Sequence, residues 1–386
     1  MGFTTHPVWR VGFRPFFLLA CLAGMLLPPL WALIFAGVMA PPDSPVPPVQ
    51  WHAHEMFYGF GWAMLAGFLL TASKNWVGIR GYHGAPLAYL AAAWLVDRTV
   101  MAFGGSWPGW LQAACSQLFI VAAAAMLMAT LVRHRRSDSY DDNHFFLVAL
   151  AAFPFAKALM LDAGHFQAGV AMTVALFRVA FLIMLERTLT QFMKNALQTE
   201  ILRRPWLDTT IKSLALVLAA APWLPRPLAI GGALLLALLL AGRLAFWQPQ
   251  RALRRLDLGI MILGYAAIIA HLCLEAVDAL VHPSWTGALT VHVFTLGVMG
   301  LIVPAMIVRI AKGHTGRKVL FEPADKAALW IMIGAFVARV VAPQVLPGAY
   351  MAWVGLAACA WLAAFTILAW RFALYLLQPR IDGKEH

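Results

Sequence analysis

The chain has 386 residues, of which 62% are hydrophobic and only 12% are charged, and its mean hydropathy is +0.76. A soluble globular protein carries about 25% charged residues, so this composition excludes a soluble domain and places the chain in a membrane. The formal net charge of +12 does not indicate nucleic-acid binding, because the Lys and Arg residues lie in short loops between apolar runs, where they determine topology.

The chain carries four cysteines, each alone within an apolar run, and has neither a C-x-x-C nor a C-x-x-C-H motif. This spacing does not indicate a thiolate metal site or a covalently attached c-type haem. The first apolar run is too long for the core of a signal peptide and lacks a small-residue cleavage site, so we expect no cleavable leader.

Apolar runs long enough to cross a bilayer recur along the chain, bounded by Pro, Gly or charged residues. They predict an all-α, polytopic integral membrane protein with a single transmembrane domain, residues 1–386. The twelve predicted spans are 13–39, 51–73, 85–103, 108–132, 143–162, 166–187, 208–224, 227–247, 257–281, 285–310, 325–346 and 349–377. A polar, basic stretch, 188–206, is expected to continue the sixth span as a helix at the membrane interface.

The charges of the loops alternate along this series of spans. The N-terminal segment carries Arg10 and Arg14, loop 41–50 has neither Lys nor Arg, and the next loop is basic again, with Lys74 and Arg80. Every even-numbered connection is basic and nearly every odd-numbered one is not. Because basic loops stay in the cytoplasm, both termini are predicted to be cytoplasmic.

Several histidines then fall in the half of the bilayer that faces away from the cytoplasm. His52 and His54 lie at the outer end of the second span. At about 1.5 Å per residue, His292 lies roughly 10 Å inside on the tenth span and His271 roughly 13 Å inside on the ninth. Imidazole is a ligand for haem iron, copper and zinc. A histidine within a span can also be hydrogen-bonded structurally or belong to a proton relay.

The spacing of these residues separates the two neighbouring histidines. Residues two apart on a helix point about 200° apart, so His52 and His54 are not expected to bind one metal ion together. His52 shares a helix face with Met56, and His271 shares one with Glu275. Glu275 is therefore expected to orient the His271 imidazole from the second coordination shell or to join it in a proton pathway.

The second and tenth spans are also similar to each other. In an alignment without gaps the following pairs coincide: His54 with His292, Gly59 with Gly297, and Lys74 with Lys312. The two spans are therefore interpreted as equivalent helices in a bundle built from four-helix units. Histidines at matching depth on two helices are the arrangement that a haem between them requires.

Four segments resemble signatures of the NnrS family, haem- and copper-containing membrane proteins linked to the nitric-oxide response. The first is WHAHEMFYGFGWAMLAGFLLTASKNW (51–76), joined by WRVGFRPFFLL (9–19), MIVRIAKGHTGR (306–317) and the more diverged ERTLTQFMKNAL (186–197). The resemblance implies a protein of the bacterial inner (plasma) membrane that contains haem b, and it leaves copper open as a second metal. It also implies nitric oxide as a ligand and a redox partner that the sequence does not identify.

The catalytic subunits of haem–copper oxidases and nitric-oxide reductases offer a more distant analogy, with twelve spans in three four-helix arcs. Carried over by position, His52 and His292 are the axial haem ligands, and His54 and His271 are second choices or ligands of a second metal. The adjacent His-His pair that helps to hold copper in those enzymes has no counterpart here. Oxidase turnover is therefore not implied, and an enzymatic step on nitric oxide stays open.

A second hypothesis is a secondary transporter for a metal, haem or a small anion. In this interpretation the histidines form a membrane-embedded pathway with Glu275 and Asp278. Arg178, near the middle of the sixth span, would contact a haem propionate under the first hypothesis and line the pathway under the second. The two hypotheses differ in one simple observation, since a haem protein is coloured when purified.

Overall fold

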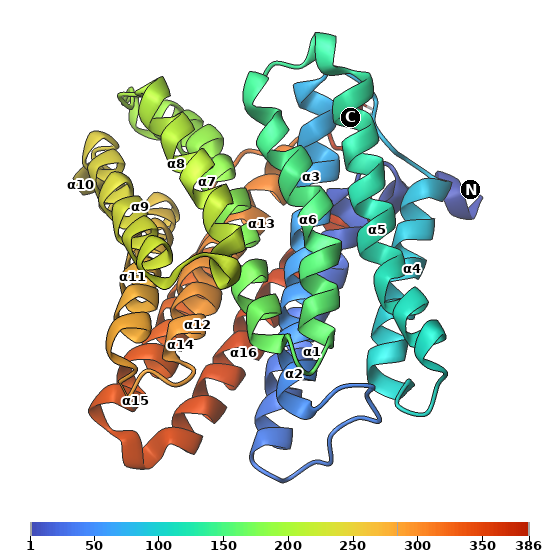
Figure 1. Cartoon of the computed structure of the whole chain (residues 1–386). Helices are drawn as coiled ribbons and strands as arrows, with labels where there is room; N and C mark the ends of the chain where they lie inside the picture. The colour runs from blue at the N-terminus through green and yellow to red at the C-terminus, as the bar shows by residue number, and fades with distance from the viewer. Residues whose placement is uncertain (1, 284, 385–386) are drawn as a thin grey trace. The chain divides into compact units, whose positions relative to one another are not determined.

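The computed structural model describes residues 2–283 and 285–384, which form helices and connecting loops without a β-strand (Figure 1). The chain divides into two compact units. Unit 1 comprises Met1–Val170, Met306–Leu320 and Trp361–His386, and unit 2 comprises Ala171–Ala305 and Phe321–Ala360. The all-helical fold class is confirmed, whereas the single-domain interpretation stays a prediction.

Unit 1 contains the first helices of the chain and the ends of two later ones. Its α-helices are α1 (Phe13–Phe35), α2 (Pro48–His54), α3 (Trp62–Trp76), α4 (Ala85–Phe103), α5 (Gly109–Arg133) and α6 (His144–Leu161). A π-helical segment, η3 (Glu55–Gly61), joins α2 to α3 in one continuous helix. Short 3-10 turns are η1 (Phe3–Thr5), η2 (Pro7–Trp9), η4 (Arg135–Ser137) and η5 (Asp141–Asn143).

The remaining helices belong wholly or partly to unit 2. They are α7 (Phe166–Leu197), α8 (Pro205–Val217), α9 (Arg226–Phe246), α10 (Pro249–Ala252), α11 (Leu256–Val281), α12 (Leu289–Phe294), α13 (Leu301–Gly313), α14 (Pro323–Phe336), α15 (Ala342–Val345) and α16 (Tyr350–Leu377). The π-helical segments are η7 (Thr295–Gly300) and η8 (Val337–Val341), and the 3-10 turns are η6 (Leu218–Trp223) and η9 (Pro347–Ala349). Helices α7, α13 and α16 each continue from one unit into the other.

Ten helical segments of the described chain are long and apolar enough to cross a membrane. The two other predicted spans, 85–103 and 208–224, correspond to α4 and to α8 with η6. Asp97 and Arg98 lower the hydropathy of α4, Asp208 and Lys212 lower that of α8, and α8 passes at Leu218 into the 3-10 turn η6. The count of twelve spans and the three four-helix units are therefore not confirmed.

The predicted interfacial segment 188–206 divides into two parts. Its first part continues α7 without a break to Leu197, so that this helix has 32 residues and is about 48 Å long. Residues 198–204 are not helical, and α8 begins at Pro205. The end of α7 therefore extends beyond the length that a bilayer core requires.

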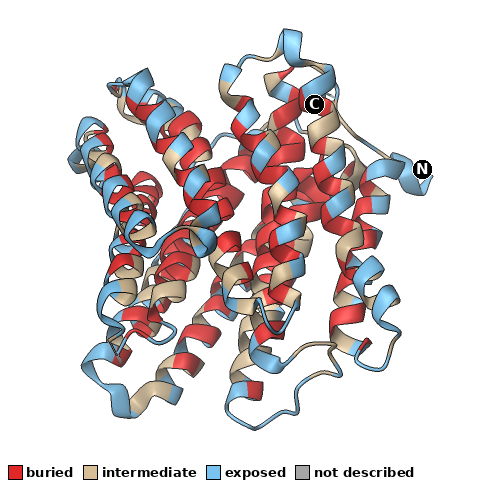
Figure 2. Ribbon diagram, viewed as in Figure 1, coloured by how far each residue is buried: buried red, intermediate tan, exposed pale blue. Residues whose placement is uncertain are grey.

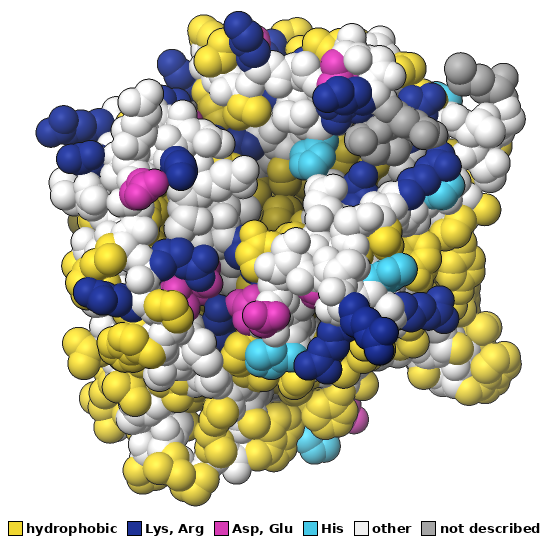
Figure 3. All heavy atoms as spheres, turned by 90° about the horizontal axis from the view of Figure 1, so that it is seen from above, with side chains coloured by type: hydrophobic (Ala, Val, Ile, Leu, Met, Phe, Trp, Pro, Cys, Tyr) yellow, Lys and Arg dark blue, Asp and Glu magenta, His cyan; other side chains and the backbone are white. Residues whose placement is uncertain are grey.

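The buried residues lie on the sides of the helices that face other helices, as the red parts of the ribbon in Figure 2 show. In unit 1 the ring of Trp62 packs edge-on against Phe153, with centroids 4.9 Å apart. Gly67 lets α1 approach α3, because a Cβ atom there would lie 2.9 Å from the Cβ atom of Phe16. Figure 3, seen from above, shows Lys and Arg side chains scattered over this face and many apolar side chains along its margin. Large exposed apolar side chains such as Trp370 suit contact with lipid.

Candidate functional site

The two helices that carry the leading candidate histidines share a backbone distortion. In the α2–α3 helix, η3 begins directly after His54, and in the α12–α13 helix, η7 begins three residues after His292. In the alignment that sets Gly59 on Gly297, the two π-helical segments largely coincide. π-helical turns are rare and occur frequently at functional sites. The shared distortion agrees with the interpretation of the two spans as equivalent helices, but it is not specific to them, since η8 on the α14–α15 helix is π-helical as well.

The matched glycines of these segments lie against neighbouring helices. The indole Nε1 of Trp94 donates a hydrogen bond of 3.0 Å to the carbonyl of Gly59. A Cβ atom on Gly297 would lie 2.7 Å from the Cβ atom of Ala267 on α11. The contact at Gly297 thus requires the absence of a side chain, whereas a Cβ atom on Gly59 would meet the end of the flexible Arg98 side chain, 2.7 Å away.

His52 lies on α2 and turns toward α1. Its half-buried ring stacks on Trp31, with centroids 4.4 Å apart and an interplanar angle of 10°. Met56, one turn further along the same face, is also half-buried. The stacking restricts the plane of the imidazole, as an axial ligand requires.

His54 points to different neighbours, as expected from a spacing of two residues. It is fully buried in a cluster of charges from α4 and α6, with its Nδ1 atom 3.0 Å from Glu55 and its Nε2 atom 3.9 Å from Asp97. Arg98 pairs with Glu55 at 3.0 Å, and Lys157 pairs with Asp97 at 2.6 Å. The cluster therefore contains two carboxylates and two cations around a histidine. These four charges balance one another, so the cluster is neutral when the imidazole is neutral.

Several buried polar atoms of this cluster lack a hydrogen bond, including three guanidinium nitrogens of Arg98. The Nε2 atom of His54 and the Oδ1 atom of Asp97 are both buried without a hydrogen-bond partner, and they face each other. Buried polar atoms are normally satisfied. Sequence reasoning did not assemble this cluster, although charges inside apolar spans were a signal that could have found it.

In unit 2, Arg178 of α7 lies against two residues of α11. Its Nη2 atom donates to Oε2 of Glu275 at 2.7 Å and to Nδ1 of His271 at 3.1 Å. The Nδ1 atom of His271 is 3.7 Å from the same carboxylate. The structure thus brings together three residues that the sequence singled out.

The protonation of His271 follows from this contact. A guanidinium group only donates hydrogen bonds, so the Nδ1 atom of His271 accepts and the neutral ring carries its hydrogen on Nε2. No nitrogen lone pair of this ring is then available for a metal ion. Glu275 contacts Arg178 more closely than it contacts the imidazole, which differs from the expected carboxylate–histidine pair.

His292 on α12 has the opposite arrangement. Its Nδ1 atom lies 2.6 Å from the carbonyl oxygen of Ala288, which makes Nδ1 the protonated nitrogen. Metal-ligating histidines commonly donate this second N–H to a carbonyl or carboxylate. The Nε2 atom of the half-buried ring therefore keeps its lone pair.

The two further histidines at helix ends are engaged locally. His165 lies 2.7 Å from Asp162, and both side chains are more than half exposed. The hydrogen bond from His165 lowers the pKa of Asp162. His282 lies 3.2 Å from Nη2 of Arg226. These contacts favour a solvated, structural role for both.

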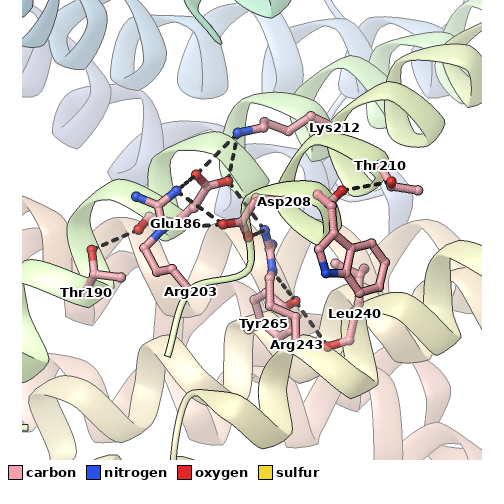
Figure 4. A network of polar contacts seen from close by, with 10 residues as sticks. Glu186, Thr190, Arg203, Asp208, Thr210, Lys212, Leu240, Arg243 and Tyr265 are labelled. Carbon is pink, nitrogen blue, oxygen red and sulfur yellow. Dashed lines mark hydrogen bonds and ion pairs between the residues drawn. The ribbon is translucent and has the colours of Figure 1, made fainter. Parts of the chain in front are cut away.

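A second buried ion network joins α7, α8, α9 and α11 in unit 2 (Figure 4). Glu186 binds Lys212 at 3.0 Å and also Arg203, while Arg243 binds Asp208 at 3.4 Å. The hydroxyl group of Tyr265 accepts a 2.9 Å hydrogen bond from Nε of Arg243. The sequence did not predict this network, because its members lie on separate helices.

The described residues contain no group of three or more His, Cys, Asp or Glu side chains that could hold a metal ion. A haem iron needs only one or two axial ligands from the protein. The observed hydrogen bonds therefore fit His292 to an axial role and do not fit His271 to a metal.

Comparison with known proteins adds one match. The family model described as NnrS protein matches residues 7–380, nearly the whole chain. No curated protein matches the chain.

Proposed function

We propose that this chain, which belongs to the NnrS family, is a haem b-binding membrane protein of the nitric-oxide response, with His52 and His292 as haem ligands. The family match supports a membrane protein of the nitric-oxide response. The haem, its ligands, the bacterial inner membrane and the cytoplasmic termini are part of the proposal.

The observation that carries the haem assignment is the hydrogen bond between His292 and Ala288. With the proton of Nδ1 engaged at 2.6 Å, Nε2 is the nitrogen that can bind a metal, and the ring is held in one orientation. The π-helical turn that follows this histidine recurs after the histidines of the α2–α3 helix, which supports a related role for both helices.

His52 is proposed as the other ligand because its ring is held flat against Trp31. His52 belongs to unit 1 and His292 to unit 2, so each ligand is proposed and tested by itself. When bound, haem b supplies an iron centre that can bind nitric oxide. The protein would hold the imidazoles in fixed orientations through Trp31 and Ala288.

For the second metal, copper, the structure favours His54 over His271. The Nε2 atom of His54 is buried without a hydrogen-bond partner, whereas the corresponding lone pair of His271 accepts from Arg178. A copper ion would therefore have one imidazole available from the α2–α3 helix, and removal of His54 tests this part separately.

The haem proposal is tested by the absorption spectrum of the full-length protein purified from haem-replete cells. We expect a Soret band that shifts on reduction and is lost in His292→Ala and in His52→Ala. His282→Ala, at a histidine engaged with Arg226, is the matched control and should keep the band. A colourless, folded preparation of the unsubstituted protein contradicts the proposal.

Transport is the alternative function, and one observation favours it. Arg178 and His271 are buried within apolar helices, and Arg178 pairs with the partly exposed Glu275. Ionisable groups inside a membrane are typical of substrate and proton pathways. If the protein is colourless, loss of metal or anion uptake in Arg178→Gln vesicles would support this function.

A further inference from the structure

Three segments that are distant in sequence meet at one end of unit 1. The ring of Phe13, at the start of α1, lies 5.5 Å from the ring of His314, which follows α13. The Nη1 atom of Arg380, beyond the end of α16, donates to the carbonyl of His314 at 3.0 Å. Two of these segments, 9–19 and 306–317, carry sequence signatures that the haem proposal does not use.

Cations gather at this junction. We call the following residues the basic cluster: Arg10, Arg14, Lys74, Arg317 and Arg380. The charges of Arg10, Arg317 and Arg380 all act on Arg14, and the charge of Arg380 acts on Lys74. These residues come from η2 to α1, from the last turn of α3, and from the segments after α13 and α16.

Arg14 is fully buried and only partly satisfied. Its Nη1 atom donates to the carbonyls of Leu376 at 2.8 Å and Gln378 at 2.6 Å. Its Nε and Nη2 atoms are buried without a hydrogen-bond partner. Three N–H donors on two nitrogen atoms of one charged group thus lack acceptors.

Lys74 is a second cation of the cluster that pairs with no carboxylate of the described residues. The residue is 8% exposed, and its ammonium group, which is not among the fully buried polar atoms, has no acceptor in the described part of the chain. Its charge acts on His314 together with that of Arg380. Burial first, and then these two cations, lower the pKa of His314 to about 4, so this imidazole adds no positive charge at neutral pH.

The carboxylate that contacts the cluster is already engaged. Both oxygens of Asp382 bind Arg380, at 2.8 and 2.5 Å. Arg317 stacks over the ring of Tyr375 at 3.8 Å and donates to the Thr315 hydroxyl at 2.9 Å. Among the residues that the structure describes, no carboxylate pairs with Arg14, Lys74 or Arg317.

A buried charge without a counterion is strongly destabilising, whereas a charge with its partner is not. An anion between these side chains would satisfy Arg14 and offset the repulsion among its neighbours. Guanidinium groups match the geometry of phosphate oxygens. The cluster also lies at the ends of membrane-spanning helices, where the phosphates of lipid head groups are found.

We propose that the basic cluster is a binding site for a phosphate-bearing anion, either the head group of an anionic phospholipid or a soluble phosphate. Lys74 and Arg317 contact the anion directly, and Arg14 donates to it from its unpartnered Nε and Nη2 atoms. This site is separate from the candidate haem ligands and does not depend on them.

The test measures thermal unfolding of the full-length, delipidated protein in detergent. One arm adds inorganic phosphate against sodium chloride of equal ionic strength. The other adds short-chain phosphatidylglycerol against phosphatidylcholine of the same chain length. Stabilisation specific to phosphate identifies a soluble ligand, and stabilisation by phosphatidylglycerol alone identifies a lipid.

Lys74→Gln and Arg317→Gln are the test variants, and Arg135→Gln/Arg136→Gln is the control, since Arg135 and Arg136 are exposed cations of the same unit. Each test variant should weaken binding roughly tenfold, the value of one charge-assisted contact. Lys74→Gln should also raise the unfolding temperature in anion-free buffer, because it removes an uncompensated charge.

Two results would overturn the site. The first is the absence of stabilisation by either phosphate or phosphatidylglycerol beyond its matched reference. The second is an equal stabilisation by the anion in the control variant and in both test variants. Such a result would assign the stabilisation to the general charge of the protein surface. Haem content is measured in the same samples, so that a failure of the haem proposal is recognised separately.

Discussion

The Nζ atom of Lys157 lies 2.6 Å from Oδ2 of Asp97, and neither side chain has exposed surface. The two residues come from different helices, α6 and α4, within unit 1. Lys157 also donates to the carbonyl of Ser116 on α5. One buried ammonium group thus connects three helices. Its removal should therefore lower the stability of the whole unit.

Lys157→Met is expected to destabilise the protein by about 1.5–3 kcal/mol, because the buried Asp97 carboxylate loses this partner and keeps only Arg98, 2.8 Å away. The double variant Lys157→Met/Asp97→Asn should recover part of the loss. Unfolding by denaturing detergent measures both. Lys194→Met, at a pair more than 60% exposed, is the control and should cost less than about 1 kcal/mol. Equal losses in Lys157→Met and Lys194→Met would refute the structural role.

The ion network of Figure 4 should respond to neutralisation in the same way. Glu186→Gln leaves Lys212, Arg203 and Arg243 around the single carboxylate of Asp208. We expect a loss of about 3–5 kcal/mol and partial recovery in Glu186→Gln/Lys212→Gln. The free energy of unfolding provides the readout, and a double variant that is less stable than Glu186→Gln would contradict this account.

The close approach at Gly297 predicts the effect of a single methyl group. Gly297→Ala should destabilise the protein by about 1–3 kcal/mol, because the new Cβ atom would overlap that of Ala267, which cannot rotate away. Gly334→Ala on α14 is the control, since nothing lies within 4 Å of its added Cβ atom. Thermal unfolding should show a loss in the first variant and none in the second.

His314 makes stability depend on pH. Its pKa of about 4 in the folded protein lies below its ordinary value of 6.5, so protonation favours the unfolded chain. The contribution of the neutral His314 ring to the free energy of unfolding is therefore complete above about pH 6.5. It is lost as the pH falls toward 4, by about 3 kcal/mol at most. The pKa of Asp382 is about 2, so its loss of stability begins only in more acidic solution.

The variant His314→Phe keeps a ring against Phe13 and removes the titration. We expect its unfolding temperature to change less between pH 6.5 and pH 4 than that of the unsubstituted protein. His83→Gln, at an exposed histidine of the same unit, should leave the slope unchanged. A slope that persists fully in His314→Phe would assign the pH dependence to other groups.

The sequence predicted the membrane class and most spans, because hydrophobic length is a property of consecutive residues. Ten of the twelve predicted spans have the length and composition to cross a membrane. The two other predicted spans, 85–103 and 208–224, correspond to α4 and to α8 with η6 and are not confirmed. The alternation of basic loops predicts the orientation of the chain, and this stays a prediction.

The sequence also indicated the equivalence of two helices. Matching Gly59 to Gly297 anticipated a relationship that the π-helical segments then support. The distortions themselves were not predicted, because a π turn depends on which neighbouring helix must be accommodated and not on local residue preference. The directions of His52 and His54 did follow from helical spacing alone.

What the sequence determined by itself was therefore local or periodic: apolar length, charge alternation and the faces that residues share on one helix. Only the tertiary structure decided which ionisable groups meet. Asp97 with Lys157 and Arg178 with His271 are each separated by many residues. Such pairs depend on how each helix is rotated against its neighbours, and that rotation is set by side-chain packing across the whole unit.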